Sequence, residues 1–128
     1  MIIVDSSAII AIAFKEVEAR AFAEFLAPLS FLIAAPTLLE THMVLEGQPG
    51  RSAKNFFSSF LLNPRASIVP FDSDHATIAR AAFDRYGKGR HPAQLNMGDC
   101  LAYACARTHG AALLFKGNDF NRTDITVA

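Results

Sequence analysis

Four acidic residues stand where carboxylates could act together although they are far apart in the chain. Asp5 directly follows a short apolar run, and Glu40 lies in the first turn of a predicted helix that follows a second apolar run. Asp99 lies in the first turn of a later predicted helix, and Asp119 follows the apolar run after that helix. Two such charges about 4 Å apart repel by about 4 kcal/mol at an effective dielectric near 20. A divalent cation, a shared proton or several backbone donors would have to offset this repulsion, and oxygen-only ligands favour magnesium or manganese.

The pattern of apolar and polar residues predicts strands that alternate with helices. The expected strands span residues 1–4, 31–35, 67–69 and 111–115, with a further short strand at 125–127. The expected helices span residues 8–14, 16–27, 37–46, 52–62, 72–86 and 96–109. This alternation predicts an α/β fold in which helices cover both faces of a central parallel sheet of four to five strands.

Parallel sheets form their sites outside the carboxyl ends of the strands, which is where the acids fall. Asp5, Glu40 and Asp119 each follow a strand within a few residues, and Asp99 begins a helix that must start at the same edge. Each acid also has a purely structural interpretation as a cap of a helix or turn. Thr37 and Glu40, for example, match a capping box, and so do Asn96 and Asp99. Spacing alone leaves the metal-site and capping interpretations equally open.

Composition limits the class of protein. A chain of 128 residues with 52% hydrophobic and 19% charged residues fits one folded domain and excludes a disordered tail. No apolar run approaches the roughly 18 residues of a membrane span, and the first ten residues carry an acid and no basic leader, so we expect no membrane or signal segment. Cys100 and Cys105 fall on different faces of one predicted helix, which argues against a disulfide. We therefore expect a reduced, cytoplasmic protein.

Charge is unevenly distributed within a formal net charge of zero. Residues 1–50 carry two basic and six acidic residues, whereas residues 51–107 carry eight basic and four acidic residues. The zero total argues against indiscriminate nucleic-acid binding, which depends on neutralising phosphates. Arg85, Lys88 and Arg90 precede Asp99 and could hold phosphates beside an acidic pocket. They equally suit the end of a helix, where basic residues complement the dipole.

Four segments of the chain resemble the PIN-domain nucleases, most closely the VapC-type toxins of bacterial type II toxin–antitoxin systems. These segments are IIVDSSAIIAI, APTLLET, LNMGDCLAYACA and LLFKGNDFNRTDI, and the likeness runs along nearly the whole chain. It implies a single PIN-like nuclease domain over residues 1–128, built as a three-layer α/β/α sandwich. It also implies that the catalytic, metal-binding residues are Asp5, Glu40, Asp99 and Asp119.

Under this resemblance we also expect roles for Ser6, which follows Asp5, and for Asn118, which precedes Asp119. Ser6 matches a small hydroxyl residue that often accompanies the first aspartate, so we expect it to support Asp5 or to cap the following helix. Asn118 stands where relatives often carry a further acid. An amide oxygen ligates more weakly than a carboxylate, so this departure would weaken a second metal without removing the other four ligands.

The resemblance further implies a magnesium-dependent endoribonuclease, with manganese as the other suitable ion, that cleaves RNA by metal-assisted phosphodiester hydrolysis. A cognate antitoxin would inhibit it by placing an arginine among the carboxylates, and the toxin would form a homodimer. Phenylalanines on two predicted helices, including Phe56 and Phe60, would pack in the core or line a groove for the antitoxin tail.

Two other functions compete with this interpretation. A phosphohydrolase of the haloacid-dehalogenase type also carries an aspartate at a strand end, but it usually needs a second aspartate where this chain has Ser7. A catalytically inactive PIN domain would only bind RNA or a partner. The four retained acids argue against that alternative, and Asn118 argues mildly for it.

Overall fold

The sheet of the computed structural model, which describes residues 1–48 and 50–128, is parallel and has the strand order β3-β2-β1-β4. Its strands are β1 (Ile2–Val4), β2 (Phe31–Ala34), β3 (Ala66–Val69) and β4 (Ala112–Leu114). All three strand pairs are parallel, and Ile3 of the central strand β1 pairs with Leu32 on one side and Leu113 on the other. The further strand expected at 125–127 is reduced to one bridge between Val127 and Leu113.

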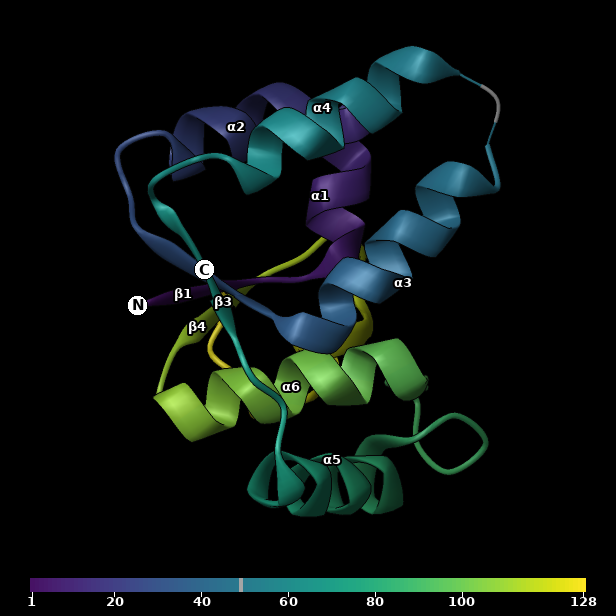
Figure 1. Cartoon of the computed structure of the whole chain (residues 1–128). Helices are drawn as coiled ribbons and strands as arrows, with labels where there is room; N and C mark the ends of the chain where they lie inside the picture. The colour runs from purple at the N-terminus through teal and green to yellow at the C-terminus, as the bar shows by residue number, and fades with distance from the viewer. Residues whose placement is uncertain (49) are drawn as a thin grey trace.

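Helices cover both faces of this sheet, which confirms the predicted three-layer arrangement (Figure 1). The helices on one face are α1 (Ser6–Ala13), α2 (Ala19–Leu26), α3 (Ala35–Glu46) and α4 (Arg51–Leu61). Those on the other face are α5 (Ser73–Tyr86) and α6 (Met97–His109). Each face has its own apolar cluster, with Ile9, Phe31 and Leu45 in the first and Leu95 and Leu113 in the second. In the part of the chain that the structure describes, no helix is both long and apolar enough to cross a bilayer.

Three helix starts differ from the prediction by two or three residues, and the first is that of α1, which begins at Ser6 instead of residue 8, directly after its cap Asp5. Helix α2 begins at Ala19 instead of residue 16, after a non-helical connection in which Lys15 has the left-handed φ of 55°. Helix α3 begins at Ala35 instead of residue 37, with Pro36 in its first turn, where a missing N–H costs no hydrogen bond. Glu40 therefore lies in the second turn, and the capping box expected of Thr37 and Glu40 was wrong: α3 starts with no side-chain cap.

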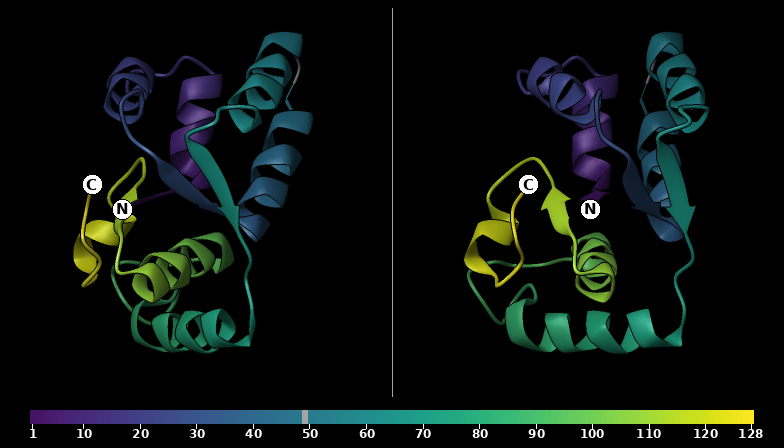
Figure 2. Two further views of the ribbon diagram at one scale, coloured as in Figure 1. Left: turned by 60° about the vertical axis from the view of Figure 1, so that its left-hand side comes forward. Right: turned by 90° about the vertical axis from the view of Figure 1, so that its left-hand side faces the viewer.

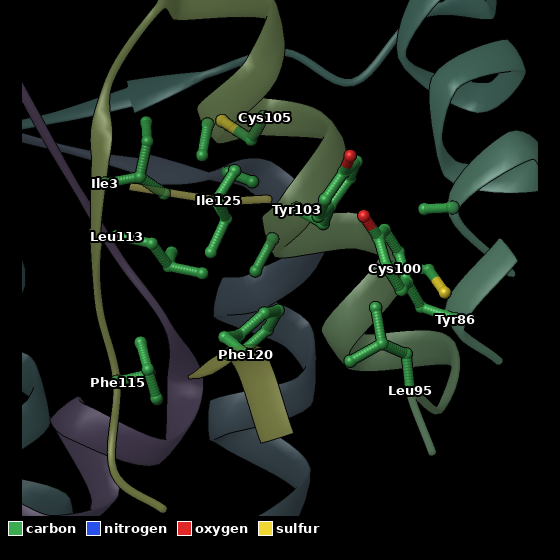
Figure 3. Packing of buried hydrophobic residues seen from close by; sticks show 14 of the residues in the cluster. Ile3, Tyr86, Leu95, Cys100, Tyr103, Cys105, Leu113, Phe115, Phe120 and Ile125 are labelled. Carbon is green, nitrogen blue, oxygen red and sulfur yellow. The ribbon is translucent and has the colours of Figure 1, made fainter. Parts of the chain in front are cut away.

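The end of the chain is anchored in the cluster under α6 (Figure 3). A short 3-10 helix, η1 (Asp119–Arg122), follows β4, and its Phe120 is buried with its ring centroid 4.9 Å from that of Phe115. The residues after η1 run back beside β4, as both views in Figure 2 show. Phe120 thus fixes the position of Asp119 at the edge of the sheet. Cys100 and Cys105 are free and buried, as expected, and burial raises the pKa of each thiol to about 11.

Candidate active site

Asp5 is a buried carboxylate at the carboxyl end of β1. It caps α1, and its Oδ2 accepts a hydrogen bond from the Ser7 N–H at 3.1 Å and from the Ser7 hydroxyl at 2.6 Å. Only 4% of Asp5 is exposed, and this burial raises its pKa to about 6 although the Ser7 hydrogen bonds oppose the rise. The charges of Asp99 and Glu40 raise the pKa further. Asp5 therefore lies near both of these acids.

Asp99 occupies the first turn of α6, where the predicted capping box is confirmed. Its Oδ2 accepts from the Asn96 N–H at 3.0 Å, while its own N–H donates to Asn96 Oδ1 at 2.9 Å. Partial burial raises the pKa of Asp99 to about 6 against the Asn96 hydrogen bond, and the charges of Asp119 and Glu40 add to the rise.

The capping and metal-site interpretations turn out to be compatible for these two aspartates. Each uses one carboxylate oxygen, Oδ2, for its local hydrogen bonds. Within the described ranges, no hydrogen bond reaches the second oxygen of either Asp5 or Asp99. Local capping fixes the orientation of each carboxylate and leaves an oxygen for a ligand.

Glu40 reaches the same region from α3, across the start of α6. A Cβ placed on Gly98 would lie 2.0 Å from Glu40 Oε2, so the Glu40 carboxylate lies directly against the Gly98 backbone. Asp119 is exposed at the start of η1, and its charge acts on Asp99. The four acids named from the sequence therefore share one neighbourhood, with Asp99 electrostatically coupled to the other three.

No basic side chain neutralises this acidic neighbourhood in the part of the chain that the structure covers. None of the four acids forms an ion pair there. Lys116 follows β4, but its ammonium group pairs with Glu16 and lies 3.4 Å from Glu18. The backbone N–H of Lys116 instead supports the site indirectly, because it donates to Ser7 Oγ at 3.0 Å.

The donor set suits a hard divalent cation. It consists of carboxylates alone, and one of them, Asp5, is buried without a basic partner among the described residues. Such oxygen ligands favour magnesium or manganese. Among the described residues, no three His, Cys, Asp or Glu side chains lie close enough to hold one ion. This geometry fits an ion held directly by one or two carboxylates and by the others through water, as magnesium commonly is.

Ser7 is the supporting residue that the sequence reasoning missed. The expectation fell on Ser6, which is buried, but no hydrogen bond among the described residues joins the Ser6 side chain to Asp5. A hydroxyl residue two positions after an aspartate is a common partner of its side chain in capping turns, and this signal could have identified Ser7. Asn118 is exposed, and its Oδ1 accepts a hydrogen bond from Asn121 at 3.3 Å.

The basic residues considered for RNA contact lie at the end of α5 and in the loop before α6. All three are exposed. Arg85 lies 3.6 Å from Asp124, and Arg90 lies 3.9 Å from Asp84, so acids offset part of both charges. Lys88 has no ion pair within the described ranges.

Comparisons with known proteins identify the family of the chain. The family model of the PIN domain matches residues 2–125. Ribonuclease VapC30 of Mycobacterium tuberculosis is 41% identical over 128 residues, which cover 98% of each chain.

Solved structures share the fold at lower identity. The crystal structure of VapC20 of Mycobacterium tuberculosis, a toxin that cleaves the sarcin-ricin loop, has a TM-score of 0.81 at 17% identity and matches 100% of this chain and 98% of its own. A toxin–antitoxin complex from Klebsiella pneumoniae has a TM-score of 0.74 at 18% identity, and the match covers 100% of this chain and 97% of that chain.

These findings favour the main interpretation over the haloacid-dehalogenase and inactive-domain alternatives. They also confirm the resemblance on which the site residues were chosen. The chain belongs to the PIN-domain family and, within it, to the VapC ribonucleases.

Proposed function

We propose that the chain is the toxin of a type II toxin–antitoxin pair and cleaves RNA at the acidic site formed around Asp5 and Asp99. The observation that carries this proposal is the buried Asp5 carboxylate, which no cation of the described protein neutralises and which lies beside two further acids. A folded protein keeps such a charge at a cost, and a bound cation removes that cost. The ribonuclease names of the similar proteins supply the class of substrate.

Asp5 and Asp99 would hold a divalent cation through their free oxygens. Magnesium is our choice, with manganese as the other suitable ion. Such an ion, when bound, lowers the pKa of a water molecule and orients it for in-line attack on a phosphodiester. Ser7 donates to Oδ2 of Asp5 and Asn96 to Oδ2 of Asp99, which keeps both carboxylates oriented.

Glu40 and Asp119 would complete this acidic shell through water. Contacts through water would be needed, because among the described residues no three acidic side chains lie close enough to hold one ion directly. Arg85, Lys88 and Arg90 would contact phosphates of the RNA outside the shell, because they are exposed at the turn that leads into α6.

An antitoxin would cover the apolar groove formed where α2 and α4 meet α1. Ile12, Leu26, Phe56 and Phe60 line this groove, and the ring of Phe60 packs against that of Phe31 below it. The sequence placed these phenylalanines either in the core or in such a groove; Phe57 is buried, whereas Phe56 and Phe60 are only partly so. The structurally similar toxin–antitoxin complex from Klebsiella pneumoniae supports a protein partner of this class.

A second copy of the chain would cover a different apolar surface, on α3 and α6. Leu39, Met43 and Met97 are exposed there, and apolar side chains gathered in this way mark protein interfaces. The proposed homodimer would bring two acidic sites into one particle. Light scattering of the purified chain tests this, and the variant Met43→Asp should shift a dimer to a monomer.

RNA cleavage is tested most directly with Asp99→Asn. We expect brief expression of the wild-type chain to arrest growth and to produce defined new RNA ends in cells. The variant should lose both effects while keeping its fold by circular dichroism. Loss of a metal ligand removes several kcal/mol of transition-state stabilisation, which corresponds to a decrease in rate of at least about a thousand-fold.

Each result has a clear meaning. New RNA ends that persist in the Asp99→Asn variant would remove Asp99 from the mechanism. The absence of growth arrest and of new ends with the wild-type chain would sink the proposed function itself.

A further inference from the structure

Gly98, the second residue of α6, has no conformational reason to be glycine. Its backbone is helical, and its φ lies outside the range that favours glycine. Within a helix glycine is less favourable than alanine, because it loses more conformational freedom on folding. Another requirement must therefore explain a glycine directly before Asp99.

The space beside Gly98 is filled by the carboxylate of Glu40. A Cβ on Gly98 would lie 2.0 Å from Oε2, 2.7 Å from Cδ and 2.9 Å from Oε1 of Glu40. All three carboxylate atoms thus lie within the space that any larger residue would need. By contrast, a Cβ on Gly47, at the end of α3, would meet nothing nearer than 3.5 Å.

We propose that Gly98 is a positioning residue of the acidic site: its missing side chain leaves the space in which the Glu40 carboxylate lies against the start of α6, beside Asp99. This inference rests on the proposed function, since it concerns the same site. The first turn of α6 then presents two carboxylates, that of Asp99 held by its capping box and that of Glu40 held in the Gly98 gap. The positive end of the α6 dipole favours both anions at this place.

The steric conflict created by a side chain at position 98 would fall on the flexible end of Glu40. The nearest atoms are the three at the tip of Glu40, and no backbone atom is among them. Glu40 can rotate away without disturbing α3 or α6, so Gly98→Ala should fold normally. The damage should appear in the acidic site alone.

The experiment measures manganese affinity by titration calorimetry, the melting temperature without metal, and RNA cleavage. Gly98→Ala should keep or raise the melting temperature, because alanine suits a helix better than glycine. We expect it to weaken manganese binding by about 10-fold to 100-fold, the range typical when residues that orient metal ligands are changed. Gly47→Ala is the matched control, and it should leave both manganese affinity and cleavage at the wild-type level.

A double-variant cycle tests whether Gly98 acts through Glu40. In a Glu40→Ala background the space is already empty, so adding Gly98→Ala should change manganese affinity by less than about two-fold. An equal loss with and without Glu40 would show that the effect arises in the α6 backbone and would overturn the inference. If Gly98→Ala lowers the melting temperature, recovery in the double variant supports the contact with Glu40, and failure to recover refutes it.

The two proposals fail in different ways. A wild-type chain that neither binds manganese nor cleaves RNA would sink the proposed function, and the role of Gly98 with it. A wild-type chain that does both, with Gly98→Ala matching it within two-fold, would leave the function standing and remove Gly98 alone.

Discussion

Aspartates meet opposite environments in two regions of this molecule. At the sheet edge, Asp5 and Asp99 are desolvated and surrounded by other acids, and the pKa of each rises to about 6. On the far side of α6, Asp124 accepts a hydrogen bond from the Tyr103 hydroxyl at 2.6 Å and lies 3.6 Å from Arg85, and its pKa is lowered. The protein thus gives Asp124 two arginine partners, whereas Asp5 and Asp99 have only local hydrogen bonds and, among the described residues, no basic partner.

This contrast separates a structural role from a functional one. The Asp124 cluster, formed by Asp124, Tyr103, Arg85 and Arg107, ties the end of the chain to α5 and α6. The charge of Asp5 contributes nothing comparable, since burial opposes its ionised form. An acid that destabilises the fold when ionised is informative, because perturbed groups of this kind concentrate at functional sites. The contrast predicts that the two regions respond in opposite ways to pH, to substitution and to metal.

The largest stability effect is expected for Asp5→Asn. The folded pKa of Asp5, about 6, exceeds its usual 3.8, so between these values the folded state binds more protons than the unfolded state. Stability from this group is therefore fully present below about pH 4, falls as the pH rises through 6, and stays low above it. Since one pKa unit equals about 1.4 kcal/mol, Asp5→Asn should stabilise the metal-free protein by roughly 3 kcal/mol at pH 7.5. Urea unfolding with a chelator at pH 4.5 and pH 7.5 measures this gain, which should shrink to about 1 kcal/mol at the lower pH, where the unfolded carboxyl is still mostly ionised.

Metal addition provides the control for this variant. Magnesium or manganese should raise the melting temperature of the wild-type chain, because an ion that binds only the folded state stabilises it. The rise should shrink in Asp5→Asn, which has lost a carboxylate ligand. An equal rise in both proteins would place the ion elsewhere, and a destabilised Asp5→Asn would show that the Asp5 charge is compensated after all.

Substitution of Asp124 should have the opposite sign. Asp124→Asn weakens the hydrogen bond from Tyr103 and the attraction of Arg85 and Arg107, and we expect it to destabilise the fold by about 1 kcal/mol at pH 7.5. The pKa of Asp124 is lowered, so its contribution is present above its unfolded value of 3.8 and is lost as the pH falls through its folded pKa.

Tyr103→Phe is the matched variant for this cluster, because it removes the hydroxyl and keeps the ring. Urea unfolding should show a loss similar to that of Asp124→Asn, and RNA cleavage should keep the wild-type rate in both variants. A gain in stability from Asp124→Asn would abolish the contrast between the two regions.

The sequence predicted which acids gather at the sheet edge better than it predicted the residues that orient them. Strand ends and helix starts follow from local patterns, so the positions of Asp5 and Asp99, and even the Asn96–Asp99 capping box, were predictable. Ser7 was missed because two serines follow Asp5 and only the backbone turn decides which one faces it. The role of Gly98 depends on how α3 packs across α6, a tertiary relation that no local pattern encodes.

Helix α3 illustrates the same limit at the level of the fold. Thr37 and Glu40 have the spacing of a capping box, but Pro36 supports a helix that starts two residues earlier, at Ala35. Once the start moves, Thr37 is buried in the helix, where its carbonyl accepts from the Thr41 hydroxyl. Glu40 is thereby released from the backbone and reaches the acidic site.

The smallest expected effect concerns the basic residues that lie between the two regions. If Arg85, Lys88 and Arg90 hold phosphates, replacing all three with glutamine should flatten the dependence of RNA affinity on salt concentration, by up to about one unit of slope per residue. The non-cleaving Asp99→Asn background allows affinity to be measured at several salt concentrations. Lys88→Gln alone should account for most of the change, since Arg85 and Arg90 already lie near acids.

Arg107→Gln is the matched control, because Arg107 lies 3.7 Å from the same Asp124 as Arg85 but at the opposite end of α6 from Asp99. It should lower stability slightly and leave the salt slope unchanged. An equal change of slope in Arg107→Gln and Lys88→Gln would mean that RNA responds to the total charge of the chain. An unchanged slope in the triple variant would assign Arg85 to the Asp124 cluster alone, and the RNA-contacting surface would then have to lie elsewhere around the acidic edge.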